Sequence, residues 1–104
     1  MIALVRDRSA ELRLLCIRYN VARLALFGSA ARGRDFQPES SDLDFLVEFA
    51  PLPANRRADR YFGLLADLEQ LFHRSVDLLD VAAIRNPYLE QAVAASEELL
   101  YAAA

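Results

Sequence analysis

Hydrophobic residues recur along this chain with two different periods. In three long stretches they repeat at helical spacing, which is typical of helices with one buried face, and three short stretches are apolar or alternate apolar with polar residues, which is typical of strands. The pattern therefore predicts helices at residues 4–19, at residues 54–72 and from about residue 87 to the end, and strands at residues 21–27, 42–49 and 75–79.

The predicted strand at residues 42–49 begins with two aspartates one residue apart. Successive side chains of a strand point to opposite faces, so Asp42 and Asp44 share one face, about 6.6 Å apart along the backbone, and the apolar residues share the other. Two neighbouring carboxylates repel each other and resist burial unless cations compensate their charge. The pair therefore predicts a divalent-metal site.

A tight turn follows the strand at residues 21–27. Gly28 lets the backbone turn closely because it has no Cβ, and Ser29 is a good N-cap for a short helical turn at residues 30–32. The start of a helix after a glycine exposes N–H groups that favour a phosphate, and Arg32 adds positive charge nearby. A phosphate-binding turn and a pair of metal-binding carboxylates are thus predicted on adjacent elements.

Two residues compete for the place of a third carboxylate. Asp77 points opposite to Val76 and Leu78, so it can join the aspartate face if the two strands are neighbours. Asp80 lies just before an apolar segment, where it suits a helix N-cap or a turn. Asp77 is favoured, because an aspartate in the middle of an apolar strand has the weaker structural explanation.

At these residues the sequence resembles the nucleotidyltransferase superfamily that includes DNA polymerase β, and within it the minimal nucleotidyltransferases (MNT) that are paired with HEPN-domain toxins. The resemblance rests on Gly28-Ser29, on Ala31-Arg32-Gly33 and on Ser-Asp-Leu-Asp at residues 41–44. It implies an α/β (α+β) fold with a polymerase β-like nucleotidyltransferase core, in which a small mixed β-sheet has helices packed mainly on one face. The loop at residues 34–41 is longer than is usual in the family.

The resemblance also implies roles for the site residues. Gly28 and Ser29, together with Arg32, would bind the nucleotide phosphates. The catalytic residues would be carboxylates that bind two Mg²⁺ ions, namely Asp42, Asp44 and Asp77.

The implied reaction transfers a nucleoside monophosphate, AMP from ATP, to a hydroxyl on a partner protein. The implied partner is a HEPN RNase toxin, which the chain would silence as an antitoxin. The alternative is a non-catalytic antitoxin, a binding module of the same fold that neutralises its partner by covering it. An antibiotic-modifying enzyme is a further rival, but that class generally has an added substrate lobe, for which 104 residues leave little room.

Composition narrows the setting of this reaction. The chain is 55% hydrophobic and 26% charged, which predicts one soluble domain over residues 1–104. A net charge of −3 does not indicate a general nucleic-acid-binding surface, and no apolar run is long enough for a membrane span. The single cysteine, Cys16, cannot form an internal disulfide, which favours the reducing cytoplasm. The sequence leaves open whether the chain forms a homo-oligomer.

Other conspicuous residues have structural explanations. Cys16 lies in an apolar stripe and is predicted to be a small core residue. His73 is predicted to be structural, in the turn between a helix and a strand. A cluster of arginines at the start of the second helix predicts a solvated face or, alternatively, contact with an acidic partner; its members are Arg56, Arg57 and Arg60.

Overall fold

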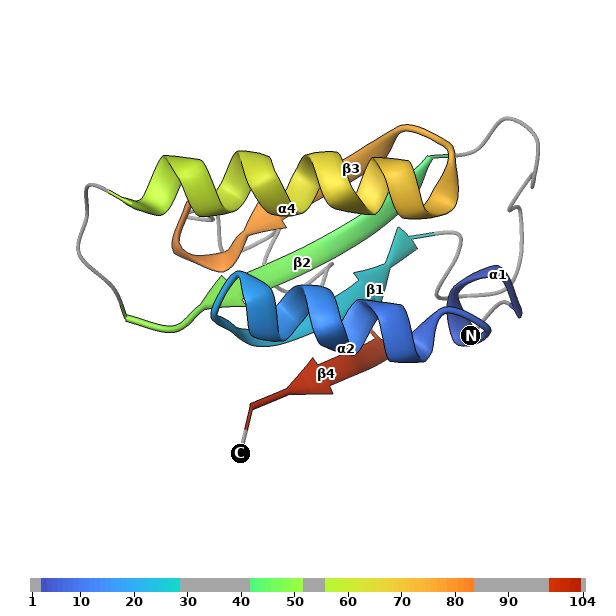
Figure 1. Ribbon diagram of the computed structural model, residues 1–104, viewed down its shortest axis with the longest axis horizontal. Helices are drawn as coiled ribbons and strands as arrows, with labels where there is room; N and C mark the ends of the chain where they lie inside the picture. Colours follow the sequence, from blue (N-terminus) through green and yellow to red (C-terminus); the bar gives the residue numbers. More distant parts are fainter. Residues whose placement is uncertain (1–2, 29–41, 52–55, 84–97, 104) are drawn as a thin grey trace.

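The computed structural model describes residues 3–28, 42–51, 56–83 and 98–103 (Figure 1). The three predicted strands are confirmed, each within one residue of its predicted bounds, and the helix predicted at residues 54–72 is described from residue 57. In chain order the elements are α1 (Ala3–Arg6), α2 (Ser9–Arg18), β1 (Val21–Phe27), β2 (Leu43–Phe49), α4 (Arg57–Phe72), β3 (Val76–Asp80), the 3-10 helix η2 (Val81–Ala83) and β4 (Glu98–Ala102).

The strands form one mixed sheet in the order β3-β2-β1-β4. Strand β1 pairs antiparallel with both β2 and β4, whereas β2 and β3 are parallel. Helices α2 and α4 lie side by side over the same face of this sheet, α4 over the β2–β3 half and α2 over the β1–β4 half (Figure 1). The predicted fold, a small mixed sheet with helices mainly on one face, is confirmed.

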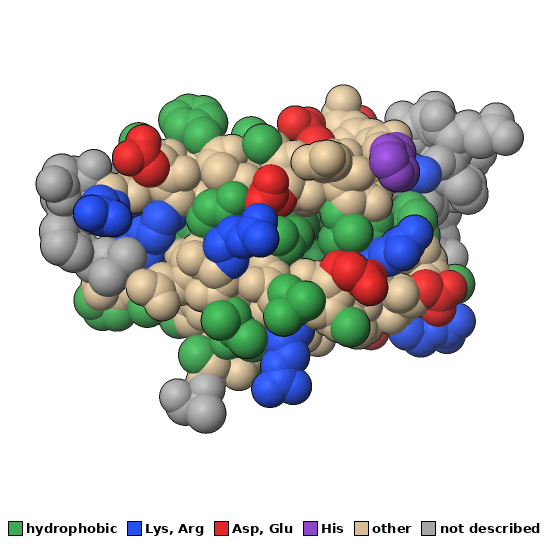
Figure 2. All heavy atoms as spheres, in the orientation of Figure 1, with side chains coloured by type: hydrophobic (Ala, Val, Ile, Leu, Met, Phe, Trp, Pro, Cys, Tyr) green, Lys and Arg blue, Asp and Glu red, His purple; other side chains and the backbone are tan. Residues whose placement is uncertain are grey.

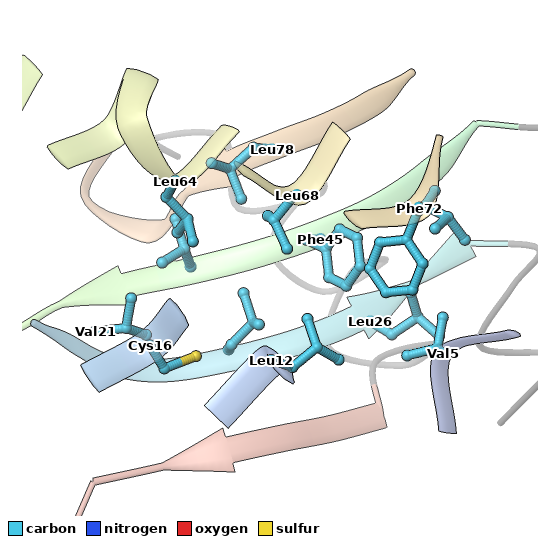
Figure 3. Packing of buried hydrophobic residues seen from close by; sticks show 13 residues of the cluster. Val5, Leu12, Cys16, Val21, Leu26, Phe45, Leu64, Leu68, Phe72 and Leu78 are labelled. Carbon is cyan, nitrogen blue, oxygen red and sulfur yellow. The ribbon is translucent and has the colours of Figure 1, made fainter. Parts of the chain in front are cut away.

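The core lies between the two helices and this face of the sheet (Figure 3). As the alternation of β2 predicts, its side chains at residues 43, 45 and 47 are fully buried here. The ring of Phe45 stacks on that of Phe72 at the end of α4, with 5.9 Å between their centroids. Cys16 is fully buried in the same core, so its prediction as a core residue is confirmed. Each such side chain contributes about 1.5–3 kcal/mol when fully buried.

The single helix predicted at residues 4–19 is wrong in one respect, because the structure divides it into α1 and α2. The division falls at Asp7 and Arg8. The hydroxyl of Ser9 donates a hydrogen bond to the carbonyl oxygen of Arg6 at 2.6 Å. Serine hydroxyls that bond to nearby backbone groups compete with helical hydrogen bonds, which accounts for a break at this serine.

The helix predicted from residue 87 to the end is wrong for the last described residues, which form the strand β4. Its residues have high helix propensity, but they pair along β1, with Ala25 opposite Leu99 and Arg23 opposite Ala102. Without β4, the backbone groups on that side of β1 would lack their ladder partners. Tertiary pairing therefore overrides local propensity here.

The two helices approach each other closely at Gly63 of α4. A Cβ on Gly63 would lie 2.6 Å from Cε1 of Tyr19, so only glycine leaves room for this ring. The Tyr19 hydroxyl donates a hydrogen bond to Oδ2 of Asp67, and Arg18 donates a second at 3.3 Å. The hydrogen bond to Asp67, then burial, raises the pKa of Tyr19. These contacts fix the spacing of the helix layer.

Helix α4 ends at His73, which has a left-handed backbone conformation with φ of 54°. His73 thus lies in the predicted turn between a helix and a strand, and its structural role stays a prediction. Among the helices of the described residues, none has the length and apolar character needed to cross a membrane.

Candidate active site

The turn after β1 brings Gly28 against Asp44. Phe27, the last residue of β1, pairs with Asp44 of β2, so Gly28 passes directly beside that aspartate. Gly28 has φ of +71°, and a Cβ at this residue would lie 2.5 Å from Oδ2 of Asp44. Glycine is therefore required twice, for the left-handed backbone and for the space that the carboxylate occupies.

Asp44 and Asp77 lie opposite each other on neighbouring strands. They are register partners in the parallel pair β2–β3, so their side chains share a face, on strands about 4.8 Å apart. This face is the one opposite to α2 and α4, because Leu43 and Phe45, on either side of Asp44, point into the helix-covered core. The sequence places Asp77 on the aspartate face only if the two strands are neighbours, and β2 and β3 are neighbours.

A small apolar cluster borders this carboxylate pair. On the same face, Ala25 and Leu46 are buried and pack with Phe27, Leu79 and Val81. Asp44 is half-buried, and Asp77 is exposed. The carboxylates thus stand at the margin of an apolar surface.

Asp42 is exposed and directly precedes β2. In the described parts of the chain, no three Asp, Glu, His or Cys side chains are grouped closely enough to hold a metal ion. The donor chemistry nevertheless fits magnesium, which prefers carboxylate oxygens and retains several water ligands.

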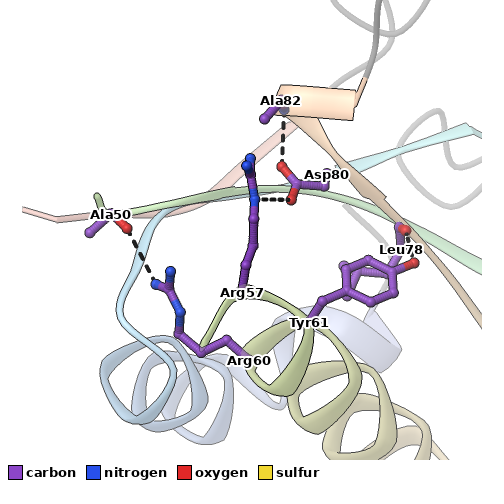
Figure 4. Close-up of polar contacts among 7 residues, drawn as sticks. All are labelled: Ala50, Arg57, Arg60, Tyr61, Leu78, Asp80 and Ala82. Atoms are coloured by element: carbon purple, nitrogen blue, oxygen red, sulfur yellow. Dashed lines mark hydrogen bonds and ion pairs between the residues drawn. The ribbon is translucent and has the colours of Figure 1, made fainter. Parts of the chain in front are cut away.

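Asp80 lies on the other face of β3, toward α4 (Figure 4). Its Oδ1 accepts a hydrogen bond from the backbone N–H of Ala82 at 3.0 Å, and its Oδ2 lies 3.7 Å from Nε of Arg57. The interpretation of Asp80 as the cap of a turn is confirmed. Asp80 is therefore turned away from the face that Asp44 and Asp77 share.

The arginine cluster at the start of α4 is only partly the solvated face that the sequence predicts. Arg57 is 56% exposed but is paired with Asp80. Arg60 donates a hydrogen bond to the carbonyl oxygen of Ala50 at 3.3 Å, and its guanidinium carbon lies 5.0 Å from the centre of the Phe49 ring (Figure 4). These two arginines attach α4 to the strands beneath it.

Sequence reasoning missed the contacts that α4 makes with the backbone of β3. The hydroxyl of Tyr61 donates a hydrogen bond to the carbonyl oxygen of Leu78 at 2.6 Å. The N–H of Val76 donates one to Oε2 of Glu69 at 3.1 Å. The only signal in the sequence is that Tyr61 and Glu69 are eight residues apart and so lie near one helix face.

The other predicted binding residues, Ser29 and Arg32, lie outside the described residues, as does the loop at residues 34–41. Their assignment to the nucleotide phosphates stays a prediction.

A groove of about 330 Å³ lies elsewhere, between α2 and α4, and is lined by Leu14, Arg18 and Leu71 among others. It opens on the helix face, where both hydrophobic and charged side chains lie between the two helices (Figure 2). This groove is on the opposite side of the sheet from Asp44 and Asp77. It therefore does not belong to the candidate site.

Comparison with known proteins connects this geometry to one family. The family model "Polymerase beta, Nucleotidyltransferase" matches residues 11–104. A relative from Methanocaldococcus jannaschii, named "Putative protein adenylyltransferase", is 37% identical over 89 residues, which cover 86% of this chain and 84% of the relative.

Two solved structures are similar in fold. A structure described as a "putative minimal nucleotidyltransferase" is 32% identical, covers 90% of each chain and superposes with a TM-score of 0.73. A second, a tri-AMPylated Shewanella oneidensis HEPN toxin in complex with an MNT antitoxin, is 20% identical and has a TM-score of 0.66, covering 94% of this chain and 72% of the other. At that identity, the second likeness shows the fold alone.

Proposed function

The chain belongs to the polymerase β nucleotidyltransferase family, and we propose that it transfers AMP from ATP to a hydroxyl group of a partner protein in the cytoplasm. The observation that carries this proposal is the register of Asp44 with Asp77, with the Asp44 carboxylate close against Gly28. Two carboxylates from different strands, with a glycine turn at one of them, suit a reaction at a polyphosphate. The name of the relative that is 37% identical supports protein as the acceptor.

The proposed reaction is an in-line displacement at the α-phosphorus of ATP. The oxygen of the acceptor hydroxyl forms a bond to that phosphorus while the bond to the oxygen bridging the α- and β-phosphates breaks. Pyrophosphate leaves with the bonding electron pair, and the hydroxyl proton passes to solvent. Such reactions depend mainly on positioning and on stabilisation of developing charge.

The carboxylates Asp42, Asp44 and Asp77 would hold Mg²⁺. When bound, Mg²⁺ stabilises negative charge on the attacking and leaving oxygens. Asp44 is held against Gly28, so the turn and the carboxylate keep a fixed relative position. We assign the phosphates of ATP to Gly28, Ser29 and Arg32.

We further propose that the partner is a HEPN-type toxin and that the modification silences it. The fold likeness to an MNT antitoxin, whose toxin partner is described as tri-AMPylated, motivates this assignment. The proposal agrees with the net charge of −3, because recognition of a protein acceptor does not need a basic nucleic-acid-binding surface.

Transfer of label from ATP to the purified partner tests this function. Incubation with ATP labelled at the α-phosphate and Mg²⁺ should leave label on the partner after the two proteins are separated in denaturant. Asp44→Asn should bind the partner but leave it unlabelled. Glu48→Gln is a matched control, because Glu48 is an exposed acid on the same strand and face, away from Gly28.

The rival function, neutralisation by covering the partner, gives a different result. In that case inhibition of the partner would reverse on dissociation, at a rate set by koff, and no label would remain. Protection of cells by Asp44→Asn at the wild-type level would show that catalysis is not the mechanism.

A further inference from the structure

Two side chains of α4 bond directly to the backbone of β3. Tyr61 donates to the carbonyl oxygen of Leu78 at 2.6 Å, and Glu69 accepts from the N–H of Val76 at 3.1 Å (Figure 4 shows the first). A third contact, between Arg57 and Asp80 at 3.7 Å, joins the two elements at the end of the strand. The exposed ion pair is the weakest of the three.

These contacts reach backbone groups that β2 cannot reach. The N–H of Leu43 donates to the carbonyl oxygen of Ser75 at 3.3 Å, so residues 75, 77 and 79 direct their backbone groups toward β2. Residues 76 and 78 then direct theirs away from the sheet. Tyr61 and Glu69 therefore satisfy two backbone groups at the outer edge of β3, which no other described strand covers.

Asp77 lies between the two bonded residues, on the opposite face of the strand. A slip of β3 by one residue would turn Asp77 into the core face and remove it from Asp44. The same slip would break both hydrogen bonds, since Leu78 and Val76 would lose their positions opposite Tyr61 and Glu69. The two bonds thus oppose a one-residue slip, which would separate the two carboxylates.

We propose that Tyr61 and Glu69 are positioning residues for nucleotidyl transfer, which hold β3 so that Asp77 faces Asp44. This inference rests on the proposed function for its activity readout. Neither side chain contacts Asp44 in the described contacts, and both act through the backbone of β3.

Tyr61 is suited to remain a donor. Burial, and then the negative charges of Asp77 and Asp80, raise the pKa of its hydroxyl above the ordinary value. The hydroxyl is therefore protonated at neutral pH and can donate to the carbonyl oxygen of Leu78.

The first experiment compares Tyr61→Phe with Tyr19→Phe. Both variants remove one tyrosine hydroxyl that donates a hydrogen bond, but the Tyr19 hydroxyl bonds to the side chain of Asp67 on α4 and not to the backbone of β3. Loss of one such hydrogen bond in Tyr61→Phe should lower the rate of transfer about fivefold. Tyr19→Phe should transfer at the wild-type rate when folded. Equal rates in Tyr61→Phe and wild type would overturn the inference.

A double-mutant cycle separates positioning from general destabilisation. In an Asp77→Asn background, Tyr61→Phe should cause no further loss of transfer, because the side chain that it positions is already inactive. A further fivefold fall in that background would contradict a role through Asp77. Glu69→Gln keeps a carbonyl acceptor and should transfer at the wild-type rate. Glu69→Met has no such acceptor, and its rate of transfer should fall about fivefold, as in Tyr61→Phe.

Hydrogen exchange tests the same inference without any activity. The amides of Asp77 and Leu79 face β2, and in Tyr61→Phe they should exchange about fivefold faster, while amides in β1 should not change. Unchanged exchange at Asp77 would overturn the positioning role. If the wild-type chain transfers no AMP but this exchange difference is present, the proposed function fails and the structural inference stands.

Discussion

The carboxylate of Asp44 occupies the space that a side chain at Gly28 would need, because Oδ2 lies 2.5 Å from the position of such a Cβ. The strand that carries the candidate carboxylate and the turn assigned to the nucleotide are therefore fitted to each other. Any side chain added at the turn must move the carboxylate.

We expect Gly28→Ala to reduce both stability and transfer. A φ of +71° costs alanine about 1–2 kcal/mol, and displacement of the Asp44 carboxylate should lower transfer about a hundredfold. Urea denaturation and the labelling assay measure the two effects. Gly63→Ala is the control, since its Cβ would meet the Tyr19 ring instead, and should affect stability alone. Equal loss of transfer in both variants would argue against a site at Gly28.

The second prediction separates the two rival carboxylates. Asp77→Asn should reduce transfer by orders of magnitude with little change in the free energy of unfolding, because Asp77 is exposed on the side of the sheet away from the helices. Asp80→Asn removes the charge that pairs with Arg57 and should cost at most about 1 kcal/mol. Its rate of transfer should stay within a few-fold of wild type. If only Asp80→Asn lost activity, the third catalytic carboxylate would be Asp80 and not Asp77.

The third prediction concerns the dependence of stability on alkaline pH. Burial raises the pKa of the Cys16 thiol from 9.0 to about 12. Between these two pKa values the folded state keeps the proton on Cys16, whereas the unfolded chain loses it. The contribution of this thiol to stability is therefore complete below about pH 9 and is lost as the pH rises toward 12. Unfolding free energies should fall by about 1.4 kcal/mol per pH unit in this window.

Cys16→Ala controls for the other groups that titrate in this range. Tyr19 and Tyr61 also have raised pKa values and act in the same direction, but they remain in the variant. The alanine variant is expected to be less stable at neutral pH and to show a shallower alkaline decline. If the free energy of unfolding declined equally with pH in wild type and Cys16→Ala, burial of the Cys16 thiol would not contribute to the decline, and the prediction would be wrong.

Much of the candidate site could be predicted because strand alternation is a local property. The apolar residues of β2 fix which face is buried, and Asp44 must then lie on the other face. The same argument places Asp77, once β3 is next to β2. The metal-binding role of Asp42 stays a prediction, as do the roles of Ser29 and Arg32, which lie outside the described residues.

The errors arose where distant contacts decide the structure. Residues 98–102 have the composition of a helix, and their pairing along β1, with Leu99 opposite Ala25, makes them a strand. Arg57 is exposed, as predicted, but its pairing with Asp80 could not be predicted because it depends on the place of β3 beside α4. The hydroxyl of Tyr61 bonds to a backbone carbonyl, and backbone partners leave no residue-specific signal in a sequence.

The place of β4 also has a consequence for the order of folding. Strand β1 is central in the sheet, yet Arg23 pairs with Ala102, near the opposite end of the sequence. Closing so long a loop costs entropy before any contact repays it, so this pairing should form late. Until then, one side of a wholly apolar stretch, Leu24 to Leu26, lacks its partner and can recruit a strand from another molecule. Chaperone dependence during synthesis should therefore be greatest for variants that weaken β4, even though this strand lies apart from the candidate carboxylates.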